Sequence, residues 1–189
     1  MSIHSPHLIV PGWGDSGPEH WQTHWQRDLH ALRIEVADWC SPRPDLWISA
    51  IEAGVAALAG RDSQPPVLVA HSAGCIAIAH WARTARWPIR AALLVAPADV
   101  DHAESLASLR AHGPVPAEPL PFPSLVVTSD DDPCVDVERA EHFATAWQSE
   151  LVVIRGGGHL NSASGLGRWR YGRALLAGLL QRRELARSA

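Results

Sequence analysis

The stretch Val67-Leu68-Val69-Ala70-His71-Ser72-Ala73-Gly74 joins a continuous apolar run to a segment rich in small residues. The apolar run is typical of a strand that is buried on both faces of a parallel sheet. The segment after it predicts a helix from Ala73 to Arg86. A serine between such a strand and helix indicates a nucleophile elbow, which requires small residues two positions before and after the serine. Ala70 and Gly74 meet this requirement, although the usual motif begins with glycine. A serine that only caps the helix would fit the same position.

Other strands and helices are expected on both sides of this turn. The remaining strands are predicted at His7–Val10, Arg33–Ala37, Ala91–Ala96, Ser124–Thr128 and Glu150–Ile154. Helices are predicted to start at Pro18 and at Pro44, the latter ending near Gly60, and to cover Asp136–Trp147 and Arg170–Arg183. Strands that alternate with helices predict a parallel sheet with helices on both faces. We therefore expect an α/β fold with about six parallel strands.

The stretch from Ala98 to Pro123 is the least regular part of the chain and contains five prolines. It has room for one short helix, at about Ala103–Ala111, and the rest is expected to be a loop that crosses the top of the sheet. Because prolines stiffen a chain, this loop should wall a site rather than open and close as a lid. No internal repeat or boundary is visible, so residues 1–189 are expected to form one domain.

A serine nucleophile needs a base, and in chain order this fold supplies an acid and then a histidine. The fifth strand is followed by Ser129-Asp130-Asp131-Asp132-Pro133, and the sixth by Arg155-Gly156-Gly157-Gly158-His159. Both stretches follow the carboxyl end of a strand, which is the edge where parallel sheets place their sites. We choose Asp132 as the acid because Pro133 restricts its backbone. Asp130 and Asp131 remain alternatives. The catalytic residues predicted are thus Ser72, Asp132 and His159.

Acyl transfer also requires N–H donors for the oxyanion. One predicted donor is the backbone N–H of Ala73, which follows the serine directly. The second should come from the loop after the first strand, where Gly12-Trp13-Gly14 makes Trp13 the preferred candidate. Its indole would then wall the acyl pocket. Packing in the core is the alternative role for Trp13.

The chain resembles the small α/β-hydrolases of the retinoblastoma-binding-protein-9 and YdeN type, a former domain of unknown function. The matching stretches are Pro11–Gly14, Gly17–Trp21, Ala70–Gly74, Leu120–Ser124, Asp132-Pro133, Gly158–Asn161 and Gly165–Trp169. The resemblance spans nearly the whole chain. It implies a compact six-stranded parallel sheet with little or no lid, and a serine hydrolase triad on Ser72, Asp132 and His159. It does not identify a substrate.

Two alternatives come from other classes of protein. The family name suggests a protein-binding module on a hydrolase scaffold, so a protein partner stays open. The stretch Gly12–Gly17 also matches the G-x-G-x-x-G fingerprint of dinucleotide-binding enzymes, with Asp38 as the acid for the ribose. We disfavour a dinucleotide because Pro18 places the helix after all three glycines, whereas the third glycine of the fingerprint lies inside it.

Composition and cysteine spacing exclude several further functions. The chain has 189 residues, of which 47% are hydrophobic and 19% charged. Its net charge is -4, so no electrostatic field attracts nucleic acid or an anionic membrane.

His20 and His24 have a metal-binding spacing, but no third ligand is evident, so neither a metal nor a cofactor is expected. Three scattered cysteines, and the absence of signal-peptide features in Met1–Pro11, predict a cytoplasmic protein. The expected function is hydrolysis of small esters or amides through an acyl-enzyme.

Overall fold

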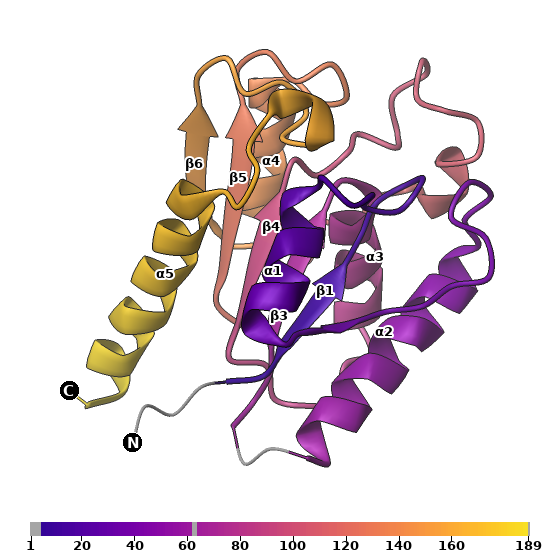
Figure 1. Cartoon of the computed structure of the whole chain (residues 1–189). Helices are drawn as coiled ribbons and strands as arrows, with labels where there is room; N and C mark the ends of the chain where they lie inside the picture. Colours follow the sequence, from indigo (N-terminus) through magenta and orange to yellow (C-terminus); the bar gives the residue numbers. More distant parts are fainter. Residues whose placement is uncertain (1–4, 62–63, 189) are drawn as a thin grey trace.

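A six-stranded, all-parallel sheet forms the centre of the computed structural model, which describes residues 5–61 and 64–188 (Figure 1). The strand order is β2-β1-β3-β4-β5-β6. The strands are β1 His7–Val10, β2 Leu32–Arg33, β3 Val67–His71, β4 Ala91–Val95, β5 Ser124–Ser129 and β6 Glu150–Ile154. This confirms the predicted α/β fold. From the sequence, no signal-peptide features were predicted in Met1–Pro11. Residues 1–4 of that stretch lie outside the described residues.

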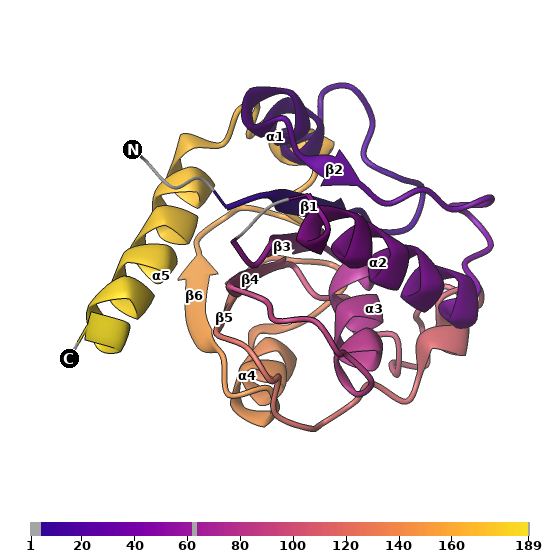
Figure 2. The same ribbon diagram turned by 90° about the horizontal axis from the view of Figure 1, so that it is seen from below.

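Helices cover both faces of the sheet, as the alternating pattern predicts. They are α1 Trp21–Leu29, α2 Pro44–Ala59, α3 Ala73–Ala82, α4 Val137–Ala146 and α5 Arg170–Ser188, with 3₁₀ turns η1 Arg110–His112 and η2 Ser162–Ser164. In Figure 2, α1 and α5 lie on one face of the sheet, and α2, α3 and α4 lie on the other. Each face therefore has its own layer of packed helices.

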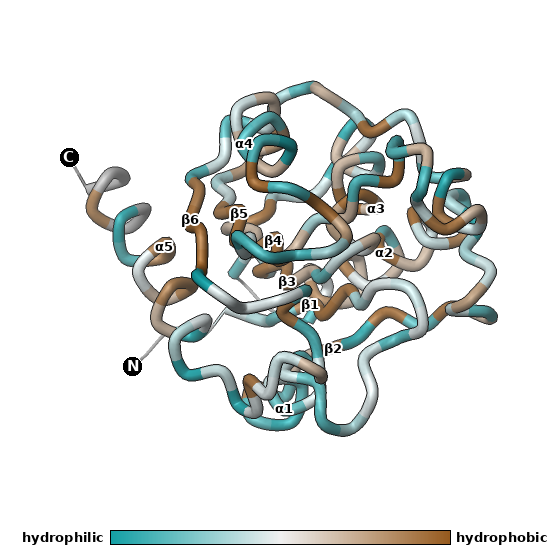
Figure 3. Tube along the Cα trace, turned by 90° about the horizontal axis from the view of Figure 1, so that it is seen from above, coloured by the Kyte–Doolittle hydropathy of each residue, from teal (hydrophilic) through white to brown (hydrophobic). Residues whose placement is uncertain are grey.

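The apolar strand residues are divided between these two layers. In β3, Leu68 and Ala70 belong to the core shared with α2, α3 and α4, whereas Val67 and Val69 belong to the core shared with α1 and α5. Figure 3 shows hydrophobic residues gathered on the central strands. Burial of one Val or Leu side chain stabilises a fold by roughly 1.5–3 kcal/mol. Burial on both faces explains why β3 reads as a continuous apolar run.

The second strand is shorter than the sequence predicts. It was expected at Arg33–Ala37, but β2 covers only Leu32–Arg33 and pairs only with β1. As an edge strand it depends on this one neighbour, and β1 ends at Val10, directly before Pro11. Proline has no N–H with which to extend a ladder, so the pairing stops there.

Two helix limits also differ from the prediction. The first helix was expected from Pro18 but begins at Trp21, because His20 keeps an extended backbone and its side chain accepts a hydrogen bond from the Gln22 N–H. Histidine is not among the favoured N-cap residues, so the sequence carried no sign of this cap. The helix expected to reach Arg86 ends at Ala82, where the chain leaves the core.

The stretch that has room for one short helix, about Ala103–Ala111, forms no α-helix. Within that stretch and its surroundings the structure contains only η1, a single 3₁₀ turn at Arg110–His112. Side chains bond to nearby backbone instead: the Nδ1 atom of His102 accepts from the N–H of Glu104. Such local bonds compete with helix formation. The segment is an irregular loop on the carboxyl-end side of the sheet, drawn in pink in Figure 1.

Candidate active site

Ser72 lies in the sharp turn between β3 and α3, with a backbone φ of 54° and ψ of -126°. Non-glycine residues rarely adopt this conformation, which costs of order 1–3 kcal/mol. A Cβ atom on Gly74 would lie 2.4 Å from the carbonyl oxygen of Pro11 and 2.6 Å from that of Val10. The close approach of β1 therefore requires glycine at position 74. The geometry is that of a nucleophile elbow rather than of an ordinary helix cap, since the Ser72 side chain makes no cap hydrogen bond.

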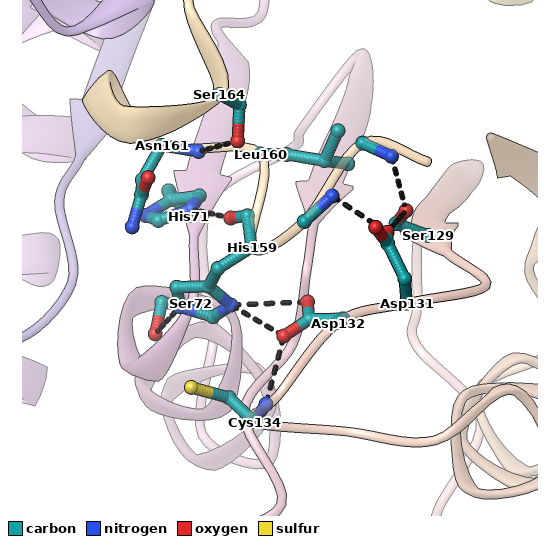
Figure 4. Close-up of polar contacts among 12 residues, drawn as sticks. His71, Ser72, Ser129, Asp131, Asp132, Cys134, His159, Leu160, Asn161 and Ser164 are labelled. Atoms are coloured by element: carbon teal, nitrogen blue, oxygen red, sulfur yellow. Dashed lines mark hydrogen bonds and ion pairs between the residues drawn. The ribbon is translucent and has the colours of Figure 1, made fainter. Parts of the chain in front are cut away.

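Ser72, His159 and Asp132 are joined in one chain of hydrogen bonds (Figure 4). The Nε2 atom of His159 lies 3.0 Å from Ser72 Oγ. Its Nδ1 atom lies 2.9 and 3.0 Å from the two carboxylate oxygens of Asp132, whose side chain is fully buried. An ionised carboxylate can only accept hydrogen bonds, so Nδ1 carries the proton. In the neutral form of His159, the other ring nitrogen, Nε2, carries no proton and accepts from the serine hydroxyl.

The two other aspartates hold the glycine loop that precedes the histidine. Asp130 accepts from the backbone of Gly156 at 2.8 Å, and Asp131 accepts from that of Gly158 at 2.7 Å. Of the three consecutive aspartates, therefore, Asp132 is the one that contacts His159. Both glycines have positive φ, 62° and 56°, a conformation that glycine adopts without strain. The loop can therefore turn back and direct the imidazole toward the elbow.

Two side chains whose contacts were not predicted from the sequence fix the backbone around His159. The Nε2 atom of His71 lies 2.9 Å from the carbonyl oxygen of His159, so a ring N–H donates there, and the two rings are 4.9 Å apart. Burial lowers the pKa of His71 well below its usual value, which keeps this ring neutral. The indole N–H of Trp21 donates to the carbonyl oxygen of Leu160 at 2.8 Å. Nothing in the local sequence indicates these contacts, because the partners are far apart in the chain.

The loop after β1 lies against the elbow, as the oxyanion prediction requires. A Cβ atom on Gly12 would approach Ser72 Cβ to 2.7 Å, so the loop is in close contact with the serine. Trp13 follows in this loop, and Ala73 is the first residue of α3, where backbone N–H groups have no intrahelical partner. The Trp13 indole donates to the carbonyl oxygen of Cys40 and lines the cavity described next. It is not core packing, since Trp13 is 43% exposed.

A cavity of about 920 Å³ opens at Ser72. This volume lies in the upper part of the range for small-molecule sites. The irregular segment contributes one wall through Ala98, Asp99, His102, Glu104, Ser105, Leu106 and Leu109. The expectation that this segment walls the site is therefore confirmed by the lining of the cavity.

The electrostatics of His159 are set by two opposing effects. Burial lowers the pKa of the imidazole, but hydrogen bonds and charge from Asp132 and Cys134 outweigh burial and raise it from 6.5 to about 9. The protonated form is therefore stabilised in the resting site. An imidazole with this raised pKa is a stronger base once it has lost its proton.

Among the described residues, one group of three potential metal ligands lies close together, and it does not include His20 or His24. Asp132, Cys134 and His159 place one donor atom each within 4.8 Å of one another. His20 and His24 are not part of any such group in the described part of the chain. His20 instead caps α1 and packs against His71, with ring centroids 4.8 Å apart.

An elbow serine at the carboxyl edge of a parallel sheet, backed by an imidazole, is the arrangement found in α/β-hydrolases, and the fold places this protein in that class. The family model described as serine hydrolase matches residues 7–178. The chain thus belongs to the serine hydrolase family, in agreement with the resemblance seen in the sequence.

Solved structures of related proteins share this fold. A YdeN-like hydrolase from Pectobacterium atrosepticum is 34% identical, with a TM-score of 0.82 over 95% of this chain and 92% of that one. The ydeN gene product of Bacillus subtilis is 20% identical, with a TM-score of 0.74 over 94% and 100% of the two chains. The esterase domain of a Rhodothermus marinus protein is 18% identical, with a TM-score of 0.69 over 95% and 89%. No curated protein sequence matches the chain.

The family match and the structural neighbours do not favour the alternative that this chain is a dinucleotide-binding enzyme. Asp38, its proposed ribose acid, lies in a loop beyond β2, where its Oδ1 atom accepts from the backbone of Cys40 and Ser41. Gly17 precedes α1 instead of lying within it. The G-x-G-x-x-G match is therefore part of the loop that contacts the elbow.

Proposed function

We propose that this protein hydrolyses small carboxylic esters, with amides as a second substrate class, through an acyl-enzyme on Ser72. The observation that carries the proposal is the continuous hydrogen-bond chain from buried Asp132 through His159 to Ser72. The Rhodothermus marinus structure, which is named as an esterase domain, supports the proposal by its fold.

Each residue has a defined part in the proposed reaction. As Ser72 Oγ attacks the acyl carbon, His159 Nε2 takes its proton and then gives it to the leaving group. Asp132 orients the imidazole and stabilises the imidazolium. The backbone N–H groups of Ala73 and Trp13 bind the oxyanion. Water then attacks the acyl-enzyme with His159 as base, which regenerates the serine. None of these steps requires a cofactor.

A fluorophosphonate probe tests this proposal directly, because it reacts only with an activated serine. We expect one equivalent to attach to Ser72, identified by peptide mass spectrometry. A protein-binding module or a dinucleotide enzyme on this scaffold would leave the folded chain unlabelled. That outcome would remove the hydrolase mechanism while leaving the fold assignment intact.

We further propose that residues 1–189 act as a single domain in the cytoplasm. The two helix layers pack on one continuous sheet, which supports the first part. The second part is supported by the free thiols of Cys40, Cys75 and Cys134. Within the described residues, no helix is long and apolar enough to span a bilayer. No observation favours a protein partner over a small-molecule substrate.

Short acyl esters, of about two to six carbons, are expected to be hydrolysed faster than long-chain lipids. The reason is that residues of segment 98–123 and Trp13 wall the cavity, and the only helical turn that the structure describes in this segment is the 3₁₀ turn η1. Because interfacial activation needs a mobile lid, this also predicts no jump in rate when the substrate passes its micelle concentration. The measurement is kcat/KM for p-nitrophenyl esters of graded acyl length. A preference for long chains, or strong interfacial activation, would show that segment 98–123 is a working lid.

The pH profile should reflect the raised pKa of His159. Only the neutral imidazole can accept the serine proton, and Asp132 and Cys134 outweigh burial and raise its pKa to about 9. We therefore expect kcat/KM for a neutral ester to rise with pH along a limb that lies above the ordinary histidine value of 6.5. This quantity reports the free enzyme. Rates measured from mildly acidic to alkaline pH, with a chelator present, would contradict the assignment if the limb fell at or below that ordinary value.

A further inference from the structure

We propose that Asp132, Cys134 and His159 form an inhibitory site for a thiophilic divalent cation such as Zn²⁺. The site lies on the residues of the proposed triad, so its inhibitory effect rests on the proposed function. Its ability to bind a cation does not. The sequence provided no sign of it, because Cys134 is far from His159 in the chain.

The local backbone brings the cysteine beside the imidazole. The N–H of Cys134 donates to Asp132 Oδ1 at 2.8 Å, which closes a tight turn over Pro133. The Cys134 sulfur lies within 4.8 Å of a ring nitrogen of His159 and of a carboxylate oxygen of Asp132. Figure 4 shows the sulfur on the side of the turn where His159 and Ser72 lie. Cys134 is exposed and lines the cavity, so a cation in solution can reach it.

The carboxylate oxygen, sulfur and ring nitrogen of the proposed site are donor types that zinc binds, and they lie only slightly farther apart than in a zinc site. Zinc takes sulfur, nitrogen and carboxylate oxygen at about 2.0–2.3 Å in a tetrahedron, which places donor atoms roughly 3.4–3.6 Å apart. The three donor atoms of the site lie within 4.8 Å of one another. Cys134 is exposed, so a change of its side-chain rotamer can bring the sulfur closer to the other two donor atoms. Three protein ligands leave the fourth position for water. Mg²⁺, which requires oxygen ligands, does not fit this set.

Binding of the cation blocks the base. The thiol of Cys134 loses its proton to solvent and binds as thiolate. If the cation binds Nε2 of His159, that nitrogen can no longer accept the proton of Ser72. If it binds Nδ1, the remaining ring proton lies on Nε2, which again cannot accept. Inhibition therefore follows from either mode of binding.

The other two cysteines provide a matched comparison. Cys75 is buried in the core, where burial raises the pKa of its thiol and keeps it protonated. Cys40 is exposed like Cys134, but its side chain is not part of the cavity lining. The variant Cys40→Ser therefore removes one exposed thiol without touching the proposed cation site.

The experiment titrates the full chain, Cys134→Ser and Cys40→Ser with ZnCl₂, and with MgCl₂ as the hard-cation control. Bound zinc is measured by competition with a chromogenic chelator, and hydrolysis of p-nitrophenyl acetate is followed in parallel. Each variant is normalised to its own activity without metal. With CdCl₂, the ultraviolet charge-transfer band of a thiolate–cadmium bond gives a signature that does not depend on turnover.

We expect one zinc equivalent to bind and inhibit the unmodified chain and Cys40→Ser alike. In Cys134→Ser, half-inhibition should need at least about tenfold more zinc, since loss of even a second-shell partner costs 10–100-fold in affinity. Equal inhibition of Cys134→Ser, or a cadmium band that persists in it, would overturn the inference. If the chain shows no esterase activity but binds zinc through Cys134, the proposed function fails and the cation site stands.

Discussion

Replacement of Ser72 by alanine is expected to lower kcat for an activated ester by about 10⁴- to 10⁶-fold, the scale seen when the nucleophile of a triad is removed. The substitution deletes the Oγ atom that lies 3.0 Å from His159 Nε2 and leaves no other nucleophile at the elbow. The oxyanion donors at Ala73 and Trp13 are backbone groups and remain, so a residual rate above that of water should persist.

The same variant should keep its stability. The strain at φ 54° is common to serine and alanine, since both carry a Cβ atom, and the Ser72 side chain makes no helix-cap hydrogen bond. Thermal unfolding of Ser72→Ala should therefore occur close to that of the parent chain. Ser105→Ala is the matched control, because Ser105 lines the same cavity without contacting the imidazole. If Ser72→Ala kept more than a few per cent of the activity, another nucleophile would have to be sought.

The substitution Asp132→Asn is expected to lower kcat by roughly 10⁴-fold, because it presents the wrong partner to His159. In the parent chain the carboxylate accepts from Nδ1–H at 2.9 Å, so the neutral imidazole carries its one proton on Nδ1 and leaves Nε2 free to accept. The asparagine amide can donate to Nδ1, which favours the tautomer with the proton on Nε2. That tautomer cannot accept the proton of Ser72. Steady-state kinetics with p-nitrophenyl acetate measures the loss.

The neighbouring aspartates provide matched controls for this change. Asp130 and Asp131 bind backbone N–H groups of the glycine loop through their Oδ1 atoms. In the variants Asp130→Asn and Asp131→Asn a carbonyl oxygen can still accept from those groups, so both should cost far less activity. An equal loss in Asp130→Asn would show that Asp132 is not the acid that supports His159.

Local pattern was sufficient to predict the interior of the sheet. β3 lies between two strands and two helix layers, so all five of its residues are buried and its apolar run is continuous. Prediction was wrong where an element depends on a distant partner. β2 ends early because β1 ends at Val10, directly before Pro11, and α1 begins late because His20 caps it. The stretch Ala103–Ala111, which has room for one short helix, forms no α-helix, since side chains there bond to nearby backbone.

In the candidate site, too, features with a local sequence pattern could be predicted, and contacts between distant positions could not. The type and order of Ser72, an aspartate and His159, each after a strand that ends at one edge, could be read from the sequence. So could the wall formed by segment 98–123. The contacts of His71 and Trp21 with the backbone of residues 159–160 could not, because they join positions 88 and 139 residues apart. No periodicity or motif records which side chain will meet another across such a separation.

The sequence by itself thus determined the parallel sheet, the elbow at Ser72 and the edge at which the site would form. Burial on both faces and the small residues at positions 70 and 74 leave clear local patterns for these features. The sequence favoured Asp132 through Pro133 but left Asp130 and Asp131 as alternatives, and the tertiary structure decided that Asp132 contacts His159. The tertiary structure alone brought Cys134 beside that imidazole. These outcomes depend on how two loops pack against each other: the glycine loop engages Asp130 and Asp131 through its backbone, which leaves the buried Asp132 side chain facing the histidine.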